Sequence, residues 1–311
     1  MNIRTLPVAL QRCDSYTPSV IAELIDRIVP CVGLNSSLHG KKVLLKPNLI
    51  SSSGPRLACT HGGFIAGAAM WFQAQGAKVL VGDSPAFGSA KKVCQTLKVL
   101  EVLHDLNVRV VNFVSPVAVK LSGGVSVTVA REALECDLFV GLPKIKAHNQ
   151  MYVTMAVKNI FGIVKGVNKA MLHMVHGNSH NQFAAIILDL MSILPPQLHL
   201  ADALEVMDKS GPLDGSCLAL DCVAGARCPV ALDTALLDLL QLTRTQSPLW
   251  RIAALRGLDG SKFDKLSFPL LTPQNFHGSG FIAPDTLYGI RFNPVRFLQN
   301  MTKRLALKVV N

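Results

Sequence analysis

Lys42-Val43-Leu44-Leu45 runs directly into Lys46-Pro47-Asn48, so an apolar strand ends in a cation, a proline and an amide. Three further apolar runs end in polar groups, at Gly82-Asp83-Ser84, at Pro143 to His148 and at Ala201-Asp202. Ligands of open parallel α/β sheets bind beyond the carboxyl ends of the strands. We therefore expect one shared site at this edge of the sheet, and the lysine-rich strand ends predict a negatively charged ligand.

The elements around this stretch alternate between strand and helix. Thr17-Pro18 predicts the start of a helix that ends near Gly33, and Thr60 is expected to cap a second helix that ends at Gly76. The other expected elements of this half are strands over 42–46, 77–81 and 108–113 and a helix over 89–104. This order predicts the α/β class, with a mostly parallel Rossmann-like sheet, flanking helices and right-handed crossovers.

The middle of the chain breaks this alternation. Two short runs, 117–121 and 125–129, flank Ser122-Gly123-Gly124 and predict an inserted β-hairpin. We further expect a strand over 137–141, a helical or mixed segment over 150–164, a helix over 181–194, strands over 198–201 and 217–223, and a helix over 229–242. These elements predict a single α/β domain over 1–311, with its core at about 40–270 and a smaller C-terminal lobe at about 245–311.

The composition narrows the classes of partner. The 311 residues carry a formal net charge of +11, which suits nucleic acid, an anionic membrane surface or a small anion. Aromatic residues are only 6% and no run of five basic residues occurs, so we expect no nucleic-acid partner. Because no uncharged apolar run reaches 18 residues and no signal pattern begins the chain, we expect no transmembrane segment and a cytoplasmic location.

The eight cysteines are scattered along the chain without a Cys-x-x-Cys pair. That spacing argues against a zinc ribbon and against the cysteine run of an iron–sulfur cluster. We therefore expect buried, reduced thiols and no iron–sulfur cluster.

Two of the strand ends are the first candidates for ligand binding. Lys46 and Asn48 offer an ammonium and an amide, which suit a carboxylate or a phosphate. Asp83 and Ser84 are open to several interpretations: Asp83 could hold a metal, orient a lysine or accept a ribose hydroxyl, and the pair could simply start a turn. No Gly-x-Gly-x-x-Gly follows a strand and no Walker-type loop exists, so NAD and ATP are disfavoured.

The stretch from Pro143 to Gly162 contains the densest set of polar groups. Lys144 and Lys146 lie two residues apart and would face the same way on an extended backbone. Thr154 and Lys158 lie four residues apart, followed by Asn159, and would share one helical face. His148 is the best candidate for general acid–base catalysis, because imidazole titrates near neutral pH and neighbouring lysines would lower its pKa.

A second group of histidines, His173, His176 and His180, could converge on a divalent metal if the segment were helical. Gly177-Asn178 between them favours a loop instead. Asp202, Asp208 and Asp221 could add oxygen ligands, although each also suits a turn or a strand end. We expect His173 and His176 to be the metal ligands if a metal is bound.

Four of these stretches, in this order, resemble a bacterial and archaeal family known as domain of unknown function 362. They are Val43 to Asn48, Gly82-Asp83-Ser84, Leu142 to His148 and Thr154 to Gly162, supported by His173, Gly211-Pro212 and Pro229 to Asp233. The resemblance covers about residues 40–270. It implies a fold remotely similar to the N-terminal domain of nickel-dependent lactate racemase. Many members append a ferredoxin-like domain with two four-iron clusters, whose cysteine run this chain lacks.

Three functions remain open at this point. The first is an enzyme on a small anionic substrate or cofactor, in which Lys46, Lys144, Lys146 and Lys158 clamp the anion, Asn48, Thr60 and Asn159 orient it, and His148 or His173 moves a proton. The second is a metal- or redox-associated accessory protein, with a redox partner protein. The third is a non-catalytic anion-binding module.

Overall fold

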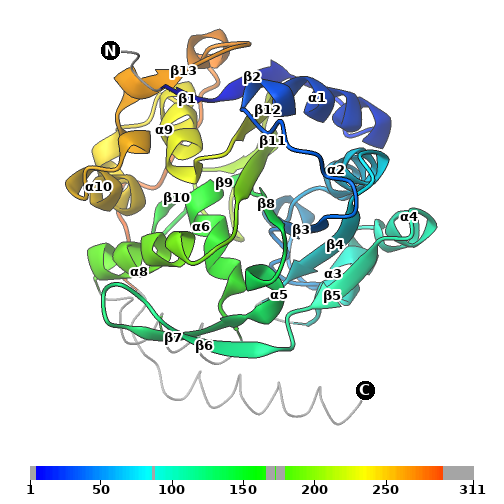
Figure 1. Cartoon of the computed structure of the whole chain (residues 1–311). Coiled ribbons are helices and arrows are strands. Elements are labelled where there is room, and N and C mark those ends of the chain that lie inside the picture. Colours follow the sequence, from blue (N-terminus) through cyan, green and yellow to red (C-terminus); the bar gives the residue numbers. More distant parts are fainter. Residues whose placement is uncertain (1–4, 86–87, 166–171, 173–178, 290–311) are drawn as a thin grey trace.

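The structure is a computed structural model of the chain, and it describes residues 5–85, 88–165, 172 and 179–289. A nine-stranded sheet runs through the molecule in the order β10-β9-β11-β8-β3-β4-β5, and β12 and then β2 continue it from β11 (Figure 1). Its strands are β2 (Ala9–Arg12), β3 (Lys42–Pro47), β4 (Lys78–Asp83), β5 (Arg109–Asn112), β8 (Leu138–Leu142), β9 (Lys144–His148), β10 (Tyr152–Thr154), β11 (Gln197–Asp208) and β12 (Ser216–Ala226).

The described helices are α1 (Pro18–Cys31), α2 (Gly62–Ala74), α3 (Ala90–Thr96), α4 (Leu100–Asp105), α5 (Arg131–Leu134), α6 (Ala156–Ile160), α8 (His180–Ser192), α9 (Pro229–Leu239) and α10 (Pro248–Leu255). Short 3-10 turns lie at η1 (Arg56–Ala58), η2 (Phe161–Ile163), η3 (Arg244–Gln246), η4 (Asp259–Ser261), η5 (Phe263–Lys265) and η6 (Pro273–Phe276). Two small sheets pair β1 (Leu6–Pro7) with β13 (Leu266–Ser267) and β6 (Pro116–Lys120) with β7 (Ser126–Ala130).

The α/β class predicted from the sequence is confirmed. β5, β4, β3, β8 and β11 pair in parallel, and helices cover both faces of the sheet. The predicted hairpin is also confirmed, since β6 and β7 pair antiparallel with Pro116 opposite Ala130. Residues 248–283 pack into the same clusters as the sheet, and the division into a core and a C-terminal lobe stays a prediction.

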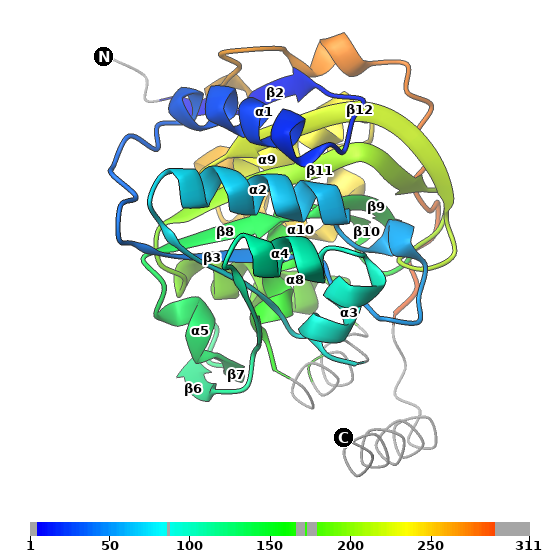
Figure 2. The ribbon, with the colours of Figure 1, turned by 90° about the vertical axis from the view of Figure 1, so that its right-hand side faces the viewer.

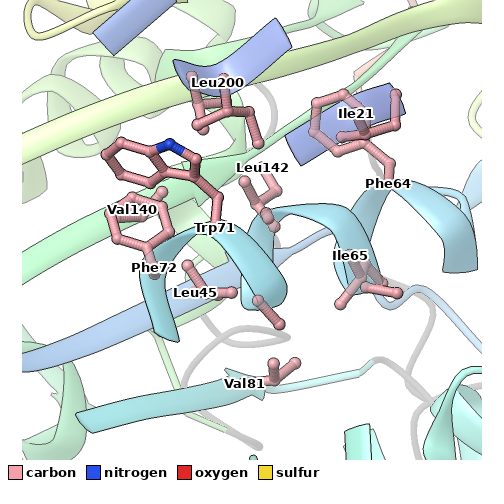
Figure 3. Packing of buried hydrophobic residues seen from close by; sticks show 14 of the residues in the cluster. Ile21, Leu45, Phe64, Ile65, Trp71, Phe72, Val81, Val140, Leu142 and Leu200 are labelled. Carbon is pink, nitrogen blue, oxygen red and sulfur yellow. The ribbon is translucent and has the colours of Figure 1, made fainter. Parts of the chain in front are cut away.

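Successive side chains of the central strands point alternately to the two faces of the sheet. Leu45 and Val140 point to the face under α1 and α2, which lie side by side in Figure 2. Figure 3 shows this layer, where Phe64 and Phe72 of α2 pack over those strands. The alternate residue Leu44 belongs instead to the cluster on the other face, with α6, α8 and α10. Because side chains alternate along a strand, Lys46 lies on the α6 face, like Leu44.

The structure adds detail to two of the expected segments and corrects a third. The polar segment after the strand expected over 137–141 forms a further strand, β9, which follows β8 after Pro143 and pairs with the same strand, β11. The segment 150–164, expected to be helical or mixed, is mixed, since the strand β10 precedes the helix α6. The helix expected over 89–104 is split into α3 and α4, because Lys98 between them has a φ of 55°, which an α-helix cannot contain.

The N-terminal strands were not predicted from the sequence at all. β2 joins the sheet by pairing with β12, so its backbone groups are satisfied by a strand far along the chain. Such a pairing has no local signal, because short strands take their stability from their neighbours. Within the described ranges, no helix combines the length and the apolar character needed to cross a membrane.

The contact between α1 and α2 generates a prediction about stability. A Cβ added to Gly67 of α2 would lie 2.6 Å from Cβ of Ile21 and 2.7 Å from the carbonyl oxygen of Pro18. We expect Gly67→Ala to lower the free energy of unfolding by about 1–2 kcal/mol, because overpacking outweighs the gain in helix propensity. Urea denaturation of the two proteins measures this difference.

Gly54→Ala is the matched control, since the added Cβ would have its nearest neighbour at 3.5 Å, an ordinary contact. The free energy of unfolding of this variant should lie within about 0.5 kcal/mol of that of the original protein. Equal stability of Gly67→Ala and Gly54→Ala would show that the two helices can move apart without cost.

Candidate functional site

The strand ends meet at one edge of the sheet, but their side chains form two separate groups. Lys46, Asp83 and Asn159 form the first, called here the Lys46 cluster, on the α6 face. Lys144, Tyr16 and Asp202 form the second, called here the Lys144 cluster, near the start of α2. The sequence predicted a single group, because it could not show on which face of the sheet each side chain lies.

The Lys46 cluster is fully buried and already contains its own anion. Lys46 Nζ lies 2.9 Å from Asp83 Oδ1 and donates hydrogen bonds to Asn159 Oδ1 and to the carbonyl of Pro47, both at 2.8 Å. Burial lowers the pKa of Lys46, and the Asp83 carboxylate opposes that shift. Of the interpretations open for Asp83, orienting a lysine is the one that this geometry supports.

Asp83 and Asn159 also hold the backbone around the strand ends. Asp83 accepts hydrogen bonds from the backbone N–H groups of Leu49 and Ser84, each at 2.8 Å. Asn159 donates from Nδ2 to the carbonyl of Lys46 at 3.0 Å. The cluster therefore fixes the exits of β3 and β4 relative to α6.

The structure shows why two further sequence motifs end in Gly162 and in Asp233. A Cβ on Gly162 would lie 2.2 Å from Cε of Lys46 and 2.5 Å from Asp83 Oδ1, so only glycine fits against the ion pair. Asp233 of α9 accepts hydrogen bonds from the first N–H groups of α6, those of Ala156 at 2.7 Å and Val157 at 3.2 Å. Burial raises the pKa of Asp233 to about 8, and these two bonds oppose the shift.

Asn48 connects the two clusters. Its Nδ2 donates to Asn159 Oδ1 at 2.8 Å, and its Oδ1 accepts the backbone N–H of Lys144 at 2.7 Å. Thr60 was expected to cap α2, but its hydroxyl accepts from Asn48 N and donates to the carbonyl of Leu142. The side chain that caps α2 is His61, which accepts the backbone N–H of Gly63.

The Lys144 cluster pairs a second buried lysine with a second aspartate. Lys144 Nζ lies 3.1 Å from both carboxylate oxygens of Asp202 and donates to the Tyr16 hydroxyl at 2.8 Å. Tyr16 in turn donates to Asp202 Oδ1 at 2.8 Å. Burial, with Asp202 beside it, raises the pKa of Tyr16 above its ordinary value.

His61 stands at the start of α2 with one ring nitrogen occupied. Nδ1 accepts the N–H of Gly63 at 3.1 Å, and the ring stacks on Tyr16 with centroids 3.7 Å apart. Desolvation lowers the pKa of His61, with Asp202 opposing the shift. The neutral ring therefore carries its proton on Nε2, where it can donate a hydrogen bond.

A pocket of about 300 Å³ adjoins the Lys144 cluster. It is lined by Arg56, Leu57, Cys59, His61, Gly62, Leu97, Lys144, Glu205 and Cys217. Its volume is at the lower end of the range for small-molecule sites. The sequence analysis did not identify Arg56, His61 and Glu205 as site residues. The one sequence pattern that could have indicated this site is His61-Gly62-Gly63 at the start of a helix.

The other predicted residues lie elsewhere. His148 accepts the backbone N–H groups of Gln150 and Met151 at Nδ1, in the turn between β9 and β10. Lys158 Nζ lies 4.8 Å from the ring centroid of Phe161 and 5.6 Å from that of Phe183. His173 and His176 lie outside the described residues.

Lys146 is buried like Lys46 and Lys144, but its bonding differs. Its Nζ donates to the backbone carbonyl of Ala58. Burial lowers the pKa of Lys146 to about 8, and the charges of Lys144 and Lys46 add to this effect while Cys59 opposes it. In the part of the chain that the structure describes, no group of three or more His, Cys, Asp and Glu side chains is placed to hold a metal ion.

A relative along the full length of the chain is the thylakoid-associated protein of Synechocystis sp.. It is 32% identical over 307 residues, which cover 97% of this chain and 95% of the relative. A family model described as Domain of unknown function (DUF362) matches residues 43–238, which include the Lys46 cluster, Lys144 and Asp202 of the Lys144 cluster, and the pocket residues from Arg56 to Cys217.

Two solved structures are also similar. The lactate racemase apoprotein from Thermoanaerobacterium thermosaccharolyticum has a TM-score of 0.48 and 12% identity and covers 74% of this chain. A protein from Thermotoga maritima has a TM-score of 0.39 and 13% identity and covers 67% of this chain. The chain spans 56% of each of these two structures. By its family match and its full-length relative, the chain belongs to the family Domain of unknown function (DUF362).

Proposed function

We propose that this protein is an enzyme that binds a small carboxylate or phosphate in the pocket at the start of α2 and moves a proton on it. The observation that carries the proposal is that Arg56, His61 and Lys144 line the same pocket. Three hydrogen-bond donors, two of them cationic, thereby face one small space. Such convergence of polar groups is typical of a binding site for a small ligand.

The start of α2 adds to the attraction for an anion. His61 and Gly62 bring the N-terminus of a 13-residue helix to the pocket wall, where the helix dipole favours negative charge. The charge of Lys144 is balanced by Asp202, so Arg56 and the helix supply most of the net attraction. This assignment replaces the larger set of lysines expected from the sequence.

His61 suits the role of a neutral hydrogen-bond donor. With Nδ1 occupied by Gly63 and a lowered pKa, its Nε2–H is free to polarise a carbonyl or bind a developing oxyanion. A neutral imidazole held at a helix N-terminus is a known electrophile of this kind.

Glu205 is the proton acceptor in the proposal, because it is the one carboxylate among the residues that line the pocket. Its backbone N–H donates to the Tyr16 hydroxyl at 3.1 Å, which ties it to the Lys144 cluster. The remaining residues predicted at the strand ends then have a structural role next to the pocket: Lys46, Asn48, Thr60, Asp83, Ser84 and Asn159. Acid–base roles for His148 and His173 stay predictions.

The second candidate is a non-catalytic anion-binding module. It is favoured by the two lysines that already have carboxylate partners, Lys46 and Lys144, since groups satisfied in this way hold structure rather than react. A metal or redox role with a redox partner protein rests on His173 and His176, outside the described residues, and it stays a prediction, as does the cytoplasmic location.

Arg56→Gln tests the binding step. We expect oxalate and inorganic phosphate to bind at least about threefold more weakly, because an exposed cation contributes modestly to anion binding. Isothermal titration calorimetry gives both affinities. Arg109→Gln is the matched control, since Arg109 is exposed on β5 and does not line the pocket. Equal losses in both variants would point to net charge rather than to the pocket.

A pH series tests the neutral state of His61. A lowered pKa keeps the ring neutral from pH 8 down through its ordinary pKa of about 6.5. The affinity for oxalate, which stays ionised over this range, should therefore change less than about twofold between pH 8 and 6. His104→Ala, at an exposed histidine of α4, serves as the control. Binding that strengthens as His61 gains a proton near pH 6.5 would contradict the proposed state.

Glu205→Gln separates the enzyme from the binding module. With pyruvate as the probe in heavy water, we expect the original protein to exchange the methyl protons and the variant to exchange them at least about 100-fold more slowly. Proton NMR follows the exchange, and calorimetry checks that the variant still binds pyruvate. Binding without exchange by the original protein would favour the non-catalytic module.

A further inference from the structure

Lys146 differs from the other buried lysines at the strand ends. Lys46 and Lys144 each pair with an aspartate, whereas none of the ion pairs among the described residues includes Lys146. Its ammonium group has a backbone carbonyl, that of Ala58, as its hydrogen-bond acceptor. A charged amine is costly to bury without a carboxylate, so this site favours the neutral amine.

Among the described residues, the surroundings of Lys146 contain a buried hydroxyl without a hydrogen-bond partner, that of Thr154. Thr154 of β10 lies directly opposite Lys146 of β9, so both side chains point to the same face of the sheet. A buried amine without a carboxylate and a buried hydroxyl without a partner lie side by side, as in a site that a ligand completes.

The hydrogen-bond acceptor of Lys146 lies between two residues of the pocket wall. Leu57 and Cys59 line the pocket, and Ala58 between them accepts the hydrogen bond from Lys146. Ala58 ends η1, a single 3-10 turn over Arg56–Ala58. An outward shift of this turn would expose the amine to a ligand bound at Arg56 in the pocket.

We propose that Lys146 is a nucleophile that forms an imine with the carbonyl carbon of a small anionic aldehyde or ketone, such as a 2-oxo acid. The inference rests on the proposed function and names the substrate class of its pocket. The lone pair of neutral Nζ attacks the carbonyl carbon, and the carbonyl oxygen leaves as water after taking up two protons. The amine supplies both protons, so no oxidant or reductant is needed.

The roles around the imine follow from positions already described. Arg56 and the start of α2 hold the carboxylate, and Nε2–H of His61 polarises the carbonyl oxygen. An imine draws electrons from the adjacent carbon, which makes its hydrogen easier for Glu205 to remove. The proposed proton transfer thereby gains the electron sink that it needs.

Reductive trapping tests the imine. The full chain is incubated with pyruvate and sodium cyanoborohydride, and peptide mass spectrometry locates the reduced adduct. We expect one dominant adduct on Lys146, formed at least about tenfold faster with pyruvate than with acetone, which replaces the carboxylate by a methyl group. Arg56→Gln should lower the rate with pyruvate by at least about threefold and leave the rate with acetone unchanged.

Matched variants make the result specific. Lys146→Met should lose the dominant adduct, and Lys120→Met, at an exposed lysine of β6, should keep it. If Lys146→Met fails to fold, as judged by circular dichroism, Lys146→Arg keeps the positive charge but cannot form the imine. A dominant adduct that persists in Lys146→Arg would overturn the assignment.

The outcomes distinguish this inference from the proposed function. Oxalate binding that depends on Arg56, without any adduct on Lys146, would overturn the imine and leave the anion pocket intact. Equal trapping of pyruvate and acetone on Lys146, unaffected by Arg56→Gln, would overturn the anionic substrate class.

The pH dependence gives an independent readout. The neutral amine is the reacting form, so trapping on Lys146 should rise as the pH increases through about 8 and level off above it. An ordinary lysine, with a pKa of about 10.4, would continue to gain reactivity over the same range. A Lys146 profile that still rises steeply above pH 9 would contradict the lowered pKa of Lys146.

Discussion

The buried ion pair between Lys46 and Asp83 is the constraint on which this edge of the sheet depends. Lys46 Nζ lies 2.9 Å from Asp83 Oδ1, and both side chains have almost no access to water. Asn159 and two backbone N–H groups complete the hydrogen bonds of the pair. Removing one partner from such a pair typically costs about 3–5 kcal/mol, because the other charge stays buried. Gly162 leaves the space that this pair occupies, so the requirement for glycine follows from the ion pair.

The alternation of side chains along the strands divides the chemistry between two faces. Lys46 meets α6 on one face, and Lys144 and Lys146 meet the start of α2 and η1 on the other. Asn48 spans the edge and binds both groups. The first face therefore holds the strand ends in place, and the second presents the pocket.

The balance of charge at each lysine separates structural from reactive groups. Lys46 and Lys144 are neutralised by Asp83 and Asp202, although the sequence suggested that they were free to clamp a ligand. Aspartates that lie 37 and 58 positions from their lysines leave no local pattern, so sequence reasoning assigned the lysines to a ligand. The sequence did not predict Arg56 and His61 as site residues, because only the fold brings η1 and the start of α2 beside Lys144.

By itself, the sequence determined the α/β class, the alternation of strands and helices along the first half of the chain, the hairpin and the family, because periodic apolar runs and short motifs are local signals. It also showed which strands end in polar groups. The tertiary structure decided which face each polar side chain occupies, which lysines have a carboxylate beside them and which residues line the pocket. These properties depend on contacts between segments far apart in the chain, and a pattern along the chain does not encode them.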